Sequence, residues 1–193
     1  MKHLTLAAAF CGLALATPAL AADDEIAALT AEAAGIVAKF SDELKGELMA
    51  AMKAGGPVNA IGVCNEKAPG IAAAAEEASG WSVRRSSHKL RNPDNTPDAY
   101  TAAAIADFVA REAEGAPASG LATAEIVEEN GQRVFRFVKA IPTGQTCLNC
   151  HGGAEVKPET EAKLAELYPA DGARGFAVDQ MRGVFTLSKV LDE

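Results

Sequence analysis

Two cysteines and a histidine stand close together in one short segment, Cys147-Leu148-Asn149-Cys150-His151. Its C-x-x-C-H spacing is the one at which a c-type haem is attached. Two thiols three positions apart can each add to a vinyl group on one porphyrin edge, and the next residue then lies under the ring with its imidazole facing the iron. The segment therefore predicts one covalent haem c, anchored by Cys147 and Cys150 and ligated by His151.

Two other uses of these cysteines stay open at this level. A Cys147–Cys150 disulfide or a thioredoxin-like redox pair is expected within a βαβ pattern, and the surrounding sequence shows no such unit. A structural zinc site made of Cys64, Cys147, Cys150 and His151 would satisfy the ligand count of a Cys₃His tetrahedron.

The start of the chain predicts export. Met1-Lys2-His3 precedes an apolar run from Leu4 to Ala16 and then Pro18-Ala19-Leu20-Ala21, the order of a secretory signal peptide. The run is too short to cross a bilayer. We therefore expect a signal peptide over residues 1–21, a single haem domain over residues 22–193, a periplasmic location and no membrane span in the mature chain.

Composition narrows the class of protein. The chain carries 18 Lys plus Arg against 26 Asp plus Glu, a formal net charge of −8, which excludes a basic nucleic-acid binder. With 49% hydrophobic and 23% charged residues it has the composition of an ordinary globular protein. Beyond His151, His88 is the only histidine of the mature chain, so a distal acid–base pair is missing and we expect no enzymatic activity.

Hydrophobic periodicity and turn residues predict the scaffold. Apolar positions recur every three or four residues from Asp23 to Ala54, which indicates one long amphipathic helix ended by Gly55-Gly56. A shorter helix follows from Pro57 to about Ser79, with Pro69 marking a kink or a break. The remaining expected elements are a strand at 81–85, a helix from the Thr96-Pro97-Asp98 cap to near Gly115, a hairpin of 122–129 and 132–141 around Asn130-Gly131, a helix at 158–167 and a last strand at 183–190.

Helices first, an antiparallel hairpin and a final strand predict an α+β domain with an antiparallel sheet, flanking helices and a long N-terminal helix. Four segments, in their order along the chain, are similar to one known family. They are Ala60–Cys64 with Ala68-Pro69, Val83–Ser87 through Pro93 to Asp98, Cys147–Gly152, and Tyr168–Asp171 through Gly175 to Phe185. In these segments the chain resembles the PAS-like c-type haem domains, secreted proteins that occur alone or as the extracellular sensor part of histidine kinases.

The resemblance implies an unusual second axial ligand, the thiolate of Cys64, opposite His151. The residues themselves are compatible with this, because a buried thiol beside ferric iron is deprotonated by coordination. They also leave other ligands open: a methionine (Met49, Met52 or Met181), His88, or an open sixth position suited to gas binding.

The expected function depends on the second axial ligand of the haem iron. A thiolate stabilises ferric iron, so ligation by His151 and Cys64 predicts a low reduction potential that suits a redox or small-ligand sensor. We expect reduction to weaken the iron–thiolate bond and free Cys64. Such a sensor needs a separate partner protein to carry the signal. The alternative is a diffusible periplasmic electron-transfer cytochrome that meets a redox partner.

Arg84, Arg85 and Arg91 form a cationic cluster in an otherwise acidic chain. Haem carries two propionates that require charged partners. We therefore expect Arg84 and Arg85 to bind the cofactor through its propionates.

Overall fold

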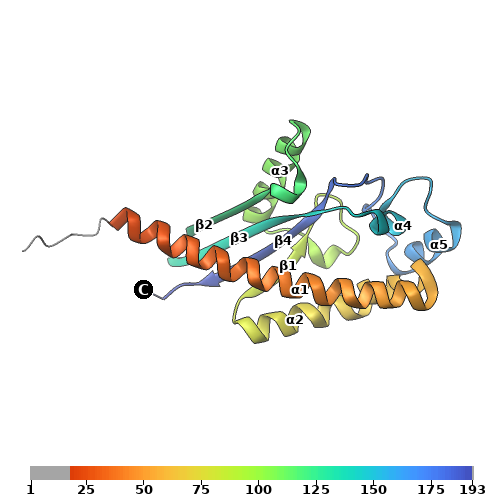
Figure 1. Cartoon of the computed structure of the whole chain (residues 1–193), viewed down its shortest axis with the longest axis horizontal. Coiled ribbons are helices and arrows are strands. Elements are labelled where there is room, and N and C mark those ends of the chain that lie inside the picture. The colour runs from red at the N-terminus through yellow and green to blue at the C-terminus, as the bar shows by residue number, and fades with distance from the viewer. Residues whose placement is uncertain (1–17, 193) are drawn as a thin grey trace, which may run out of the picture.

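A computed structural model describes residues 18–192 of the chain. Residues 1–17, most of the predicted signal peptide, lie outside this part. Four antiparallel strands form one sheet in the order β1-β4-β3-β2. The strands are β1 (Ser82–Ser86), β2 (Ala122–Glu129), β3 (Gln132–Pro142) and β4 (Met181–Val190). The helices are α1 (Pro18–Gly62), α2 (Ala68–Ser79), α3 (Ala99–Ala113), α4 (Leu148–His151) and α5 (Pro158–Leu167). The expected α+β class, with its antiparallel sheet and long N-terminal helix, is confirmed (Figure 1).

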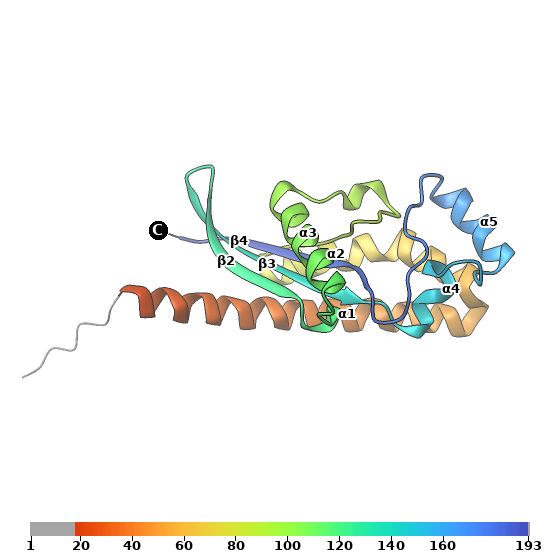
Figure 2. The ribbon, with the colours of Figure 1, turned by 90° about the horizontal axis from the view of Figure 1, so that it is seen from above.

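The long first helix folds back on itself at two glycines. Gly55 (φ −158°, ψ 18°) and Gly56 (φ 70°, ψ −165°) are non-helical, so α1 consists of a long arm and a short return arm. The return arm continues through a π-helix (Val63–Lys67) into α2, and the resulting helical hairpin is visible in Figures 1 and 2. The predicted helix end at Gly55-Gly56 is therefore confirmed.

The π-helix ends at Lys67, two residues before Pro69. Proline lacks an amide hydrogen, and its ring clashes with the carbonyl four residues earlier in an α-helix. The wider π turn avoids this conflict: the amide of Ala68 bonds the carbonyl of Val63, five residues back. The break expected at Pro69 is thus a widened turn within a continuous helical run, and π-bulges of this kind are frequent at functional sites.

The two faces of the sheet carry separate cores. On one face Phe135, Phe137 and Leu187 pack against the helical hairpin, with Phe40 of α1 meeting Phe185 edge-on at a ring-centroid distance of 5.6 Å. On the other face Val138, Ala140 and Val184 pack against Ile105 and Phe108 of α3. Both arrangements follow from the period-two alternation of side chains along a strand.

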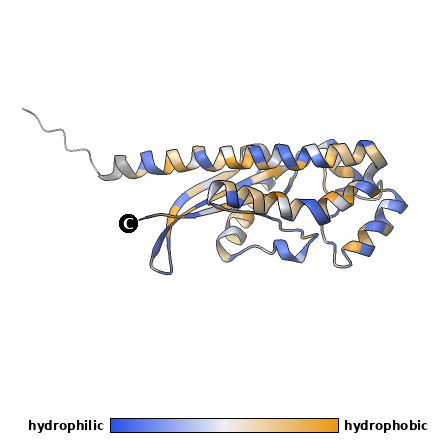
Figure 3. Cartoon of the chain, turned by 90° about the horizontal axis from the view of Figure 1, so that it is seen from below, coloured by the Kyte–Doolittle hydropathy of each residue, from blue (hydrophilic) through white to orange (hydrophobic). Residues whose placement is uncertain are grey.

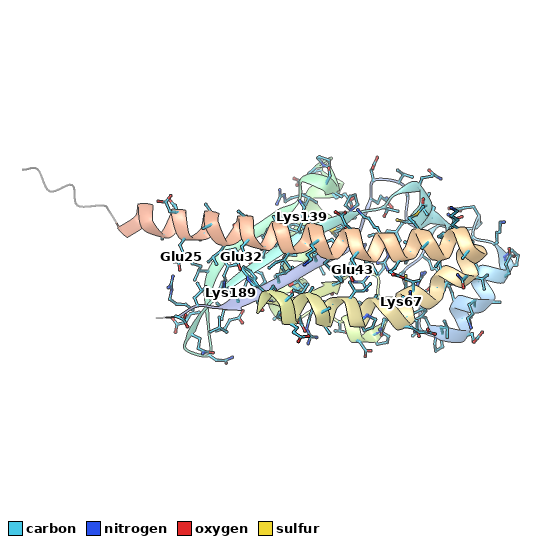
Figure 4. All side chains as sticks on the ribbon, turned by 60° about the horizontal axis from the view of Figure 1, so that its bottom comes forward. Glu25, Glu32, Glu43, Lys67, Lys139 and Lys189 are labelled. Atoms are coloured by element: carbon cyan, nitrogen blue, oxygen red, sulfur yellow. The ribbon has the colours of Figure 1, made fainter. Side chains whose placement is uncertain are left out.

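The long arm of α1 is amphipathic, with hydrophobic residues recurring between hydrophilic ones along its length (Figure 3). Its Glu32 accepts a hydrogen bond from the Trp81 indole at 2.8 Å and pairs with Lys189 of β4 at 3.3 Å (Figure 4). The Trp81 hydrogen bond lowers the pKa of Glu32. Within residues 18–192 no helix has the length and apolar character that crossing a membrane requires.

Local sequence accounts for the other elements. Asp98 caps α3 by accepting a hydrogen bond from the amide of Thr101 at 2.7 Å. Asn130 and Gly131, both with positive φ, form the tight turn between β2 and β3, as their Asn-Gly pair predicts.

Replacing Gly56 by alanine tests whether the reversal depends on its backbone. The φ/ψ region that Gly56 occupies is almost restricted to glycine, so we expect Gly56→Ala to lower the free energy of unfolding by about 1–3 kcal/mol. Gly46→Ala is the matched control, because Gly46 lies exposed inside α1 with nothing within 4 Å of an added Cβ, and it should stabilise by roughly 0.5–1 kcal/mol. Urea unfolding measures both, and equal stabilities for the two variants would contradict the assignment.

Candidate functional site

A cavity lies where the turn end of the helical hairpin meets β1, β4 and the C-x-x-C-H segment. It encloses about 230 Å³. Its apolar wall is formed by residues of α1 and the sheet: Leu44, Leu48, Met52, Ile61, Ile141 and Phe185. Its polar wall comes from the end of β1 and the loop that follows, and includes Ser86, Ser87, Asn92 and Asn95. The cavity can therefore hold a large, mostly apolar group with a polar edge.

The C-x-x-C-H segment forms one border of this cavity. Cys147 closes a short 3₁₀ turn, and Cys150 and His151 lie on α4, which follows directly. All three residues line the cavity, and both thiols are free. Burial raises the pKa of Cys150. The motif residues that the sequence singled out thus face one shared space.

The His151 imidazole is held in its neutral form. Burial and the charges of Arg182 and Arg91 lower its pKa to about 2. Its Nδ1 lies 2.9 Å from the carbonyl oxygen of Ala173, and its Nε2 lies 3.4 Å from Nη1 of Arg91. A proton on Nδ1 that is donated to this carbonyl leaves the Nε2 lone pair for a metal, which would displace the Arg91 contact.

Cys64, which lies far from the C-x-x-C-H segment in the sequence, lines the same cavity. It is a half-buried, free thiol on the π-helix. Burial lowers the pKa of the neighbouring Arg85. Among residues 18–192, no three His, Cys, Asp or Glu side chains form a group that could hold a metal ion.

The other residues considered as a second axial ligand are mostly elsewhere. Met52 lines the cavity. Met181 is buried in the core under α3, and Met49 is exposed on α1. His88 is an exposed residue whose ring meets the edge of Phe176 at 5.8 Å. Only Cys64 and Met52 of these candidates therefore share the cavity with His151.

Three arginines line the cavity, and only one of them belongs to the pair, Arg84 and Arg85, that the sequence predicted to bind the propionates. Arg85, Arg91 and Arg182 contribute to it, whereas Arg84 is exposed on the opposite face of β1 because adjacent strand residues point to opposite faces. Sequence reasoning overlooked Arg182. Its position could have indicated a role: Arg182 is a basic residue inside the β-prone run that forms β4, between Met181 and Gly183, which are both buried.

The cavity carries excess positive charge. No Asp or Glu lines it, and within residues 18–192 neither Arg85 nor Arg182 forms an ion pair with a carboxylate. Burial lowers the pKa of Arg85, and burial together with the charges of Arg91 and Arg85 lowers that of Arg182 to about 10. Arg85 and Arg182 are half-buried, and a cation withdrawn from water without an anionic partner is costly, so this wall is suited to an anionic ligand.

The residues fit a haem c. The two motif thiols, a neutral histidine and an additional thiol meet over an apolar cavity, and two arginines that form no ion pair within residues 18–192 match the two propionates of one haem. Cys147 and Cys150 would hold the porphyrin covalently, and His151 and Cys64 have the side chains to ligate its iron.

Comparison with known proteins agrees with this architecture. The model of the family described as Tll0287-like matches residues 16–189. A solved structure of the cyanobacterial heme-protein Tll0287 is 24% identical, with a TM-score of 0.60, and the match covers 84% of this chain and 97% of that one. At this identity the likeness establishes a shared fold. No curated protein matches the chain.

Proposed function

The chain belongs to the Tll0287-like family, and from this premise we propose that it is a periplasmic, mono-haem c-type cytochrome that acts as a redox or small-ligand sensor. One haem c would be attached to Cys147 and Cys150, with His151 and Cys64 as axial ligands. The solved family member of the same fold is a haem protein by its own description. The proposal assigns no catalytic residue.

The observation that carries the proposal is the convergence of Cys64 with the C-x-x-C-H segment. These thiols are more than eighty positions apart in the chain, yet they line one cavity with His151. A haem held there would supply one-electron chemistry at its iron. A thiolate ligand favours the ferric state, and the resulting low potential suits sensing better than respiratory electron transfer.

The position of Cys64 in the fold suits the transmission of a signal from the haem site to the far end of the helical hairpin. Cys64 lies on the widened helical turn, and the helical run that bears it continues through α2 to Gly80 and Trp81, directly before β1. Trp81 is buried and bonded to Glu32 of α1. A change in what the thiol binds therefore acts on a helix whose far end contacts both α1 and the sheet, and a separate partner protein would detect the result.

Absorption and EPR spectra of the wild type and of Cys64→Ala, each in the ferric and ferrous states, test the ligand assignment. We expect ferric wild type to show low-spin thiolate ligation and Cys64→Ala to lose it. Met52→Leu is the matched control, because Met52 is a thioether lining the same cavity, and it should leave the spectra unchanged.

Three results would contradict parts of the proposal. A Cys64→Ala spectrum identical to the wild type would remove Cys64 as a ligand. The same six-coordinate spectrum in both redox states, with no complex on adding CO, would reject sensing in favour of a diffusible electron carrier. A mass equal to the bare processed chain, after expression with a working maturation system, would exclude the haem.

Arg85→Gln tests the propionate assignment. Removing a positive charge beside the haem favours oxidised iron, so we expect the reduction potential to fall by on the order of 59 mV, a tenfold shift in a one-electron equilibrium. Arg84→Gln removes the same charge from the opposite face of β1 and should leave the potential unchanged. Spectroelectrochemical titration measures both, and equal potentials in the two variants would argue against a role for Arg85.

A further inference from the structure

Arg91 and Asp171 form a buried ion pair beside the cavity. Nε of Arg91 lies 3.1 Å from Oδ1 of Asp171, and Nη2 lies 3.0 Å from Oδ2, so the contact is bidentate. The side chains are 8% and 5% exposed. Hydrogen bonds from Arg91 and the Ala173 amide outweigh the effect of burial and hold the pKa of Asp171 below its usual value. Arg91 is thus engaged by a carboxylate, unlike Arg85 and Arg182.

Two atoms of this pair, Nη2 of Arg91 and Oδ1 of Asp171, also bond the two segments that surround His151, and Nη1 of Arg91 faces Nε2 of His151 at 3.4 Å. Nη2 of Arg91 donates to the carbonyl of Cys150 at 2.6 Å and to that of Ala173 at 3.2 Å. Oδ1 of Asp171 accepts a hydrogen bond from the amide of Ala173 at 2.9 Å. The pair therefore holds the peptide before His151 and both polar groups of Ala173.

The Ala173 carbonyl is the group that can orient the imidazole. Nδ1 of His151 has two neighbours, this carbonyl at 2.9 Å and Nε of Arg182 at 3.1 Å. A histidine that binds a metal through Nε2 carries its proton on Nδ1, and only the carbonyl can accept that proton. Backbone bonds add to this alignment, because the amides of Gly175 and Phe176 donate to the carbonyls of Gly152 and His151 at 2.9 and 3.0 Å.

We propose that Asp171, acting through Arg91, is a positioning residue that fixes the Ala173 carbonyl against Nδ1 of His151 and so tunes the haem iron. This inference rests on the proposed ligation of haem by His151. A buried ion pair is weak evidence for stability, since apolar replacements are often as stable. A positioning role accounts for a bidentate pair whose further hydrogen bonds end beside His151, apart from the one that Asp171 accepts from Arg174.

Replacing the Asp171 carboxylate has two effects, and both raise the reduction potential of the haem iron. Asp171→Asn leaves the Arg91 charge unbalanced beside His151, and it loosens the Ala173 carbonyl that accepts the Nδ1 proton. Both effects reduce electron donation from the imidazole to the iron and so favour ferrous iron. We expect about a tenfold shift of the redox equilibrium toward the reduced form, equivalent to about 59 mV.

The experiment compares holoprotein of the wild type, Asp171→Asn, Arg91→Lys and Glu161→Gln, by haem content, reduction potential and ferric EPR spectrum. Arg91→Lys keeps the charge but loses the bidentate fork, so its EPR spectrum should change while its potential shifts less than that of Asp171→Asn. Glu161→Gln is the matched control. It removes a carboxylate that pairs with Arg174, the other arginine on Asp171, and should change none of the three readouts.

The outcomes separate this inference from the proposed function. Wild type without haem refutes the proposed function. Haem-loaded Asp171→Asn with the wild-type potential and EPR spectrum overturns the positioning role, even if its unfolding midpoint falls, and leaves the pair as a structural contact. If Asp171→Asn does not accumulate, Arg91→Lys decides by the same two readouts, and an unchanged EPR spectrum there overturns the inference.

Discussion

The packing of α1 against the sheet is the contact on which the rest of the structure depends. Phe40 is buried against Phe185 of β4, and Glu32 is bonded to Trp81 and Lys189 further along the same helix. These contacts fix the position of the long arm of α1 on the sheet, and hence the place where the chain reverses at Gly55-Gly56. The reversal brings the return arm back over the end of the sheet, so that Cys64 lines the cavity that the C-x-x-C-H segment borders.

Charge around the cavity is divided between two kinds of arginine. Arg91 is committed to Asp171, and the pair organises the backbone beside His151. Arg85 and Arg182 have no carboxylate partner within the described residues, and burial lowers the pKa of both. One arginine thus contributes to the geometry of the site, while the other two make its wall attractive to an anion. In a chain of net charge −8, this local excess of positive charge is a property of the fold and not of the composition.

Local signals in the sequence predicted most of the elements. The Asn130-Gly131 turn, the Asp98 cap of α3 and the glycine pair after residue 54 each act over a few residues, and each appears in the structure as expected. The π-helix was harder to foresee, because Pro69 permits either a break or a widened turn, and the packing of the whole helical run decides between them. Arg84 and Arg85 look equivalent in the sequence, but strand alternation and the position of α1 place only Arg85 in the cavity.

By itself, the sequence determined the spacing of two thiols and a histidine, which depends only on covalent order, and the class of fold, which depends on periodicity. It could not determine which distant side chains meet those residues. Arg182, the Arg91–Asp171 pair and the exclusion of His88 from the cavity all depend on how the segment from Asp171 to Gly183 packs against the loop after β1. Such contacts arise when elements bury their apolar faces together, and that outcome is a property of the assembled chain and not of any short segment within it.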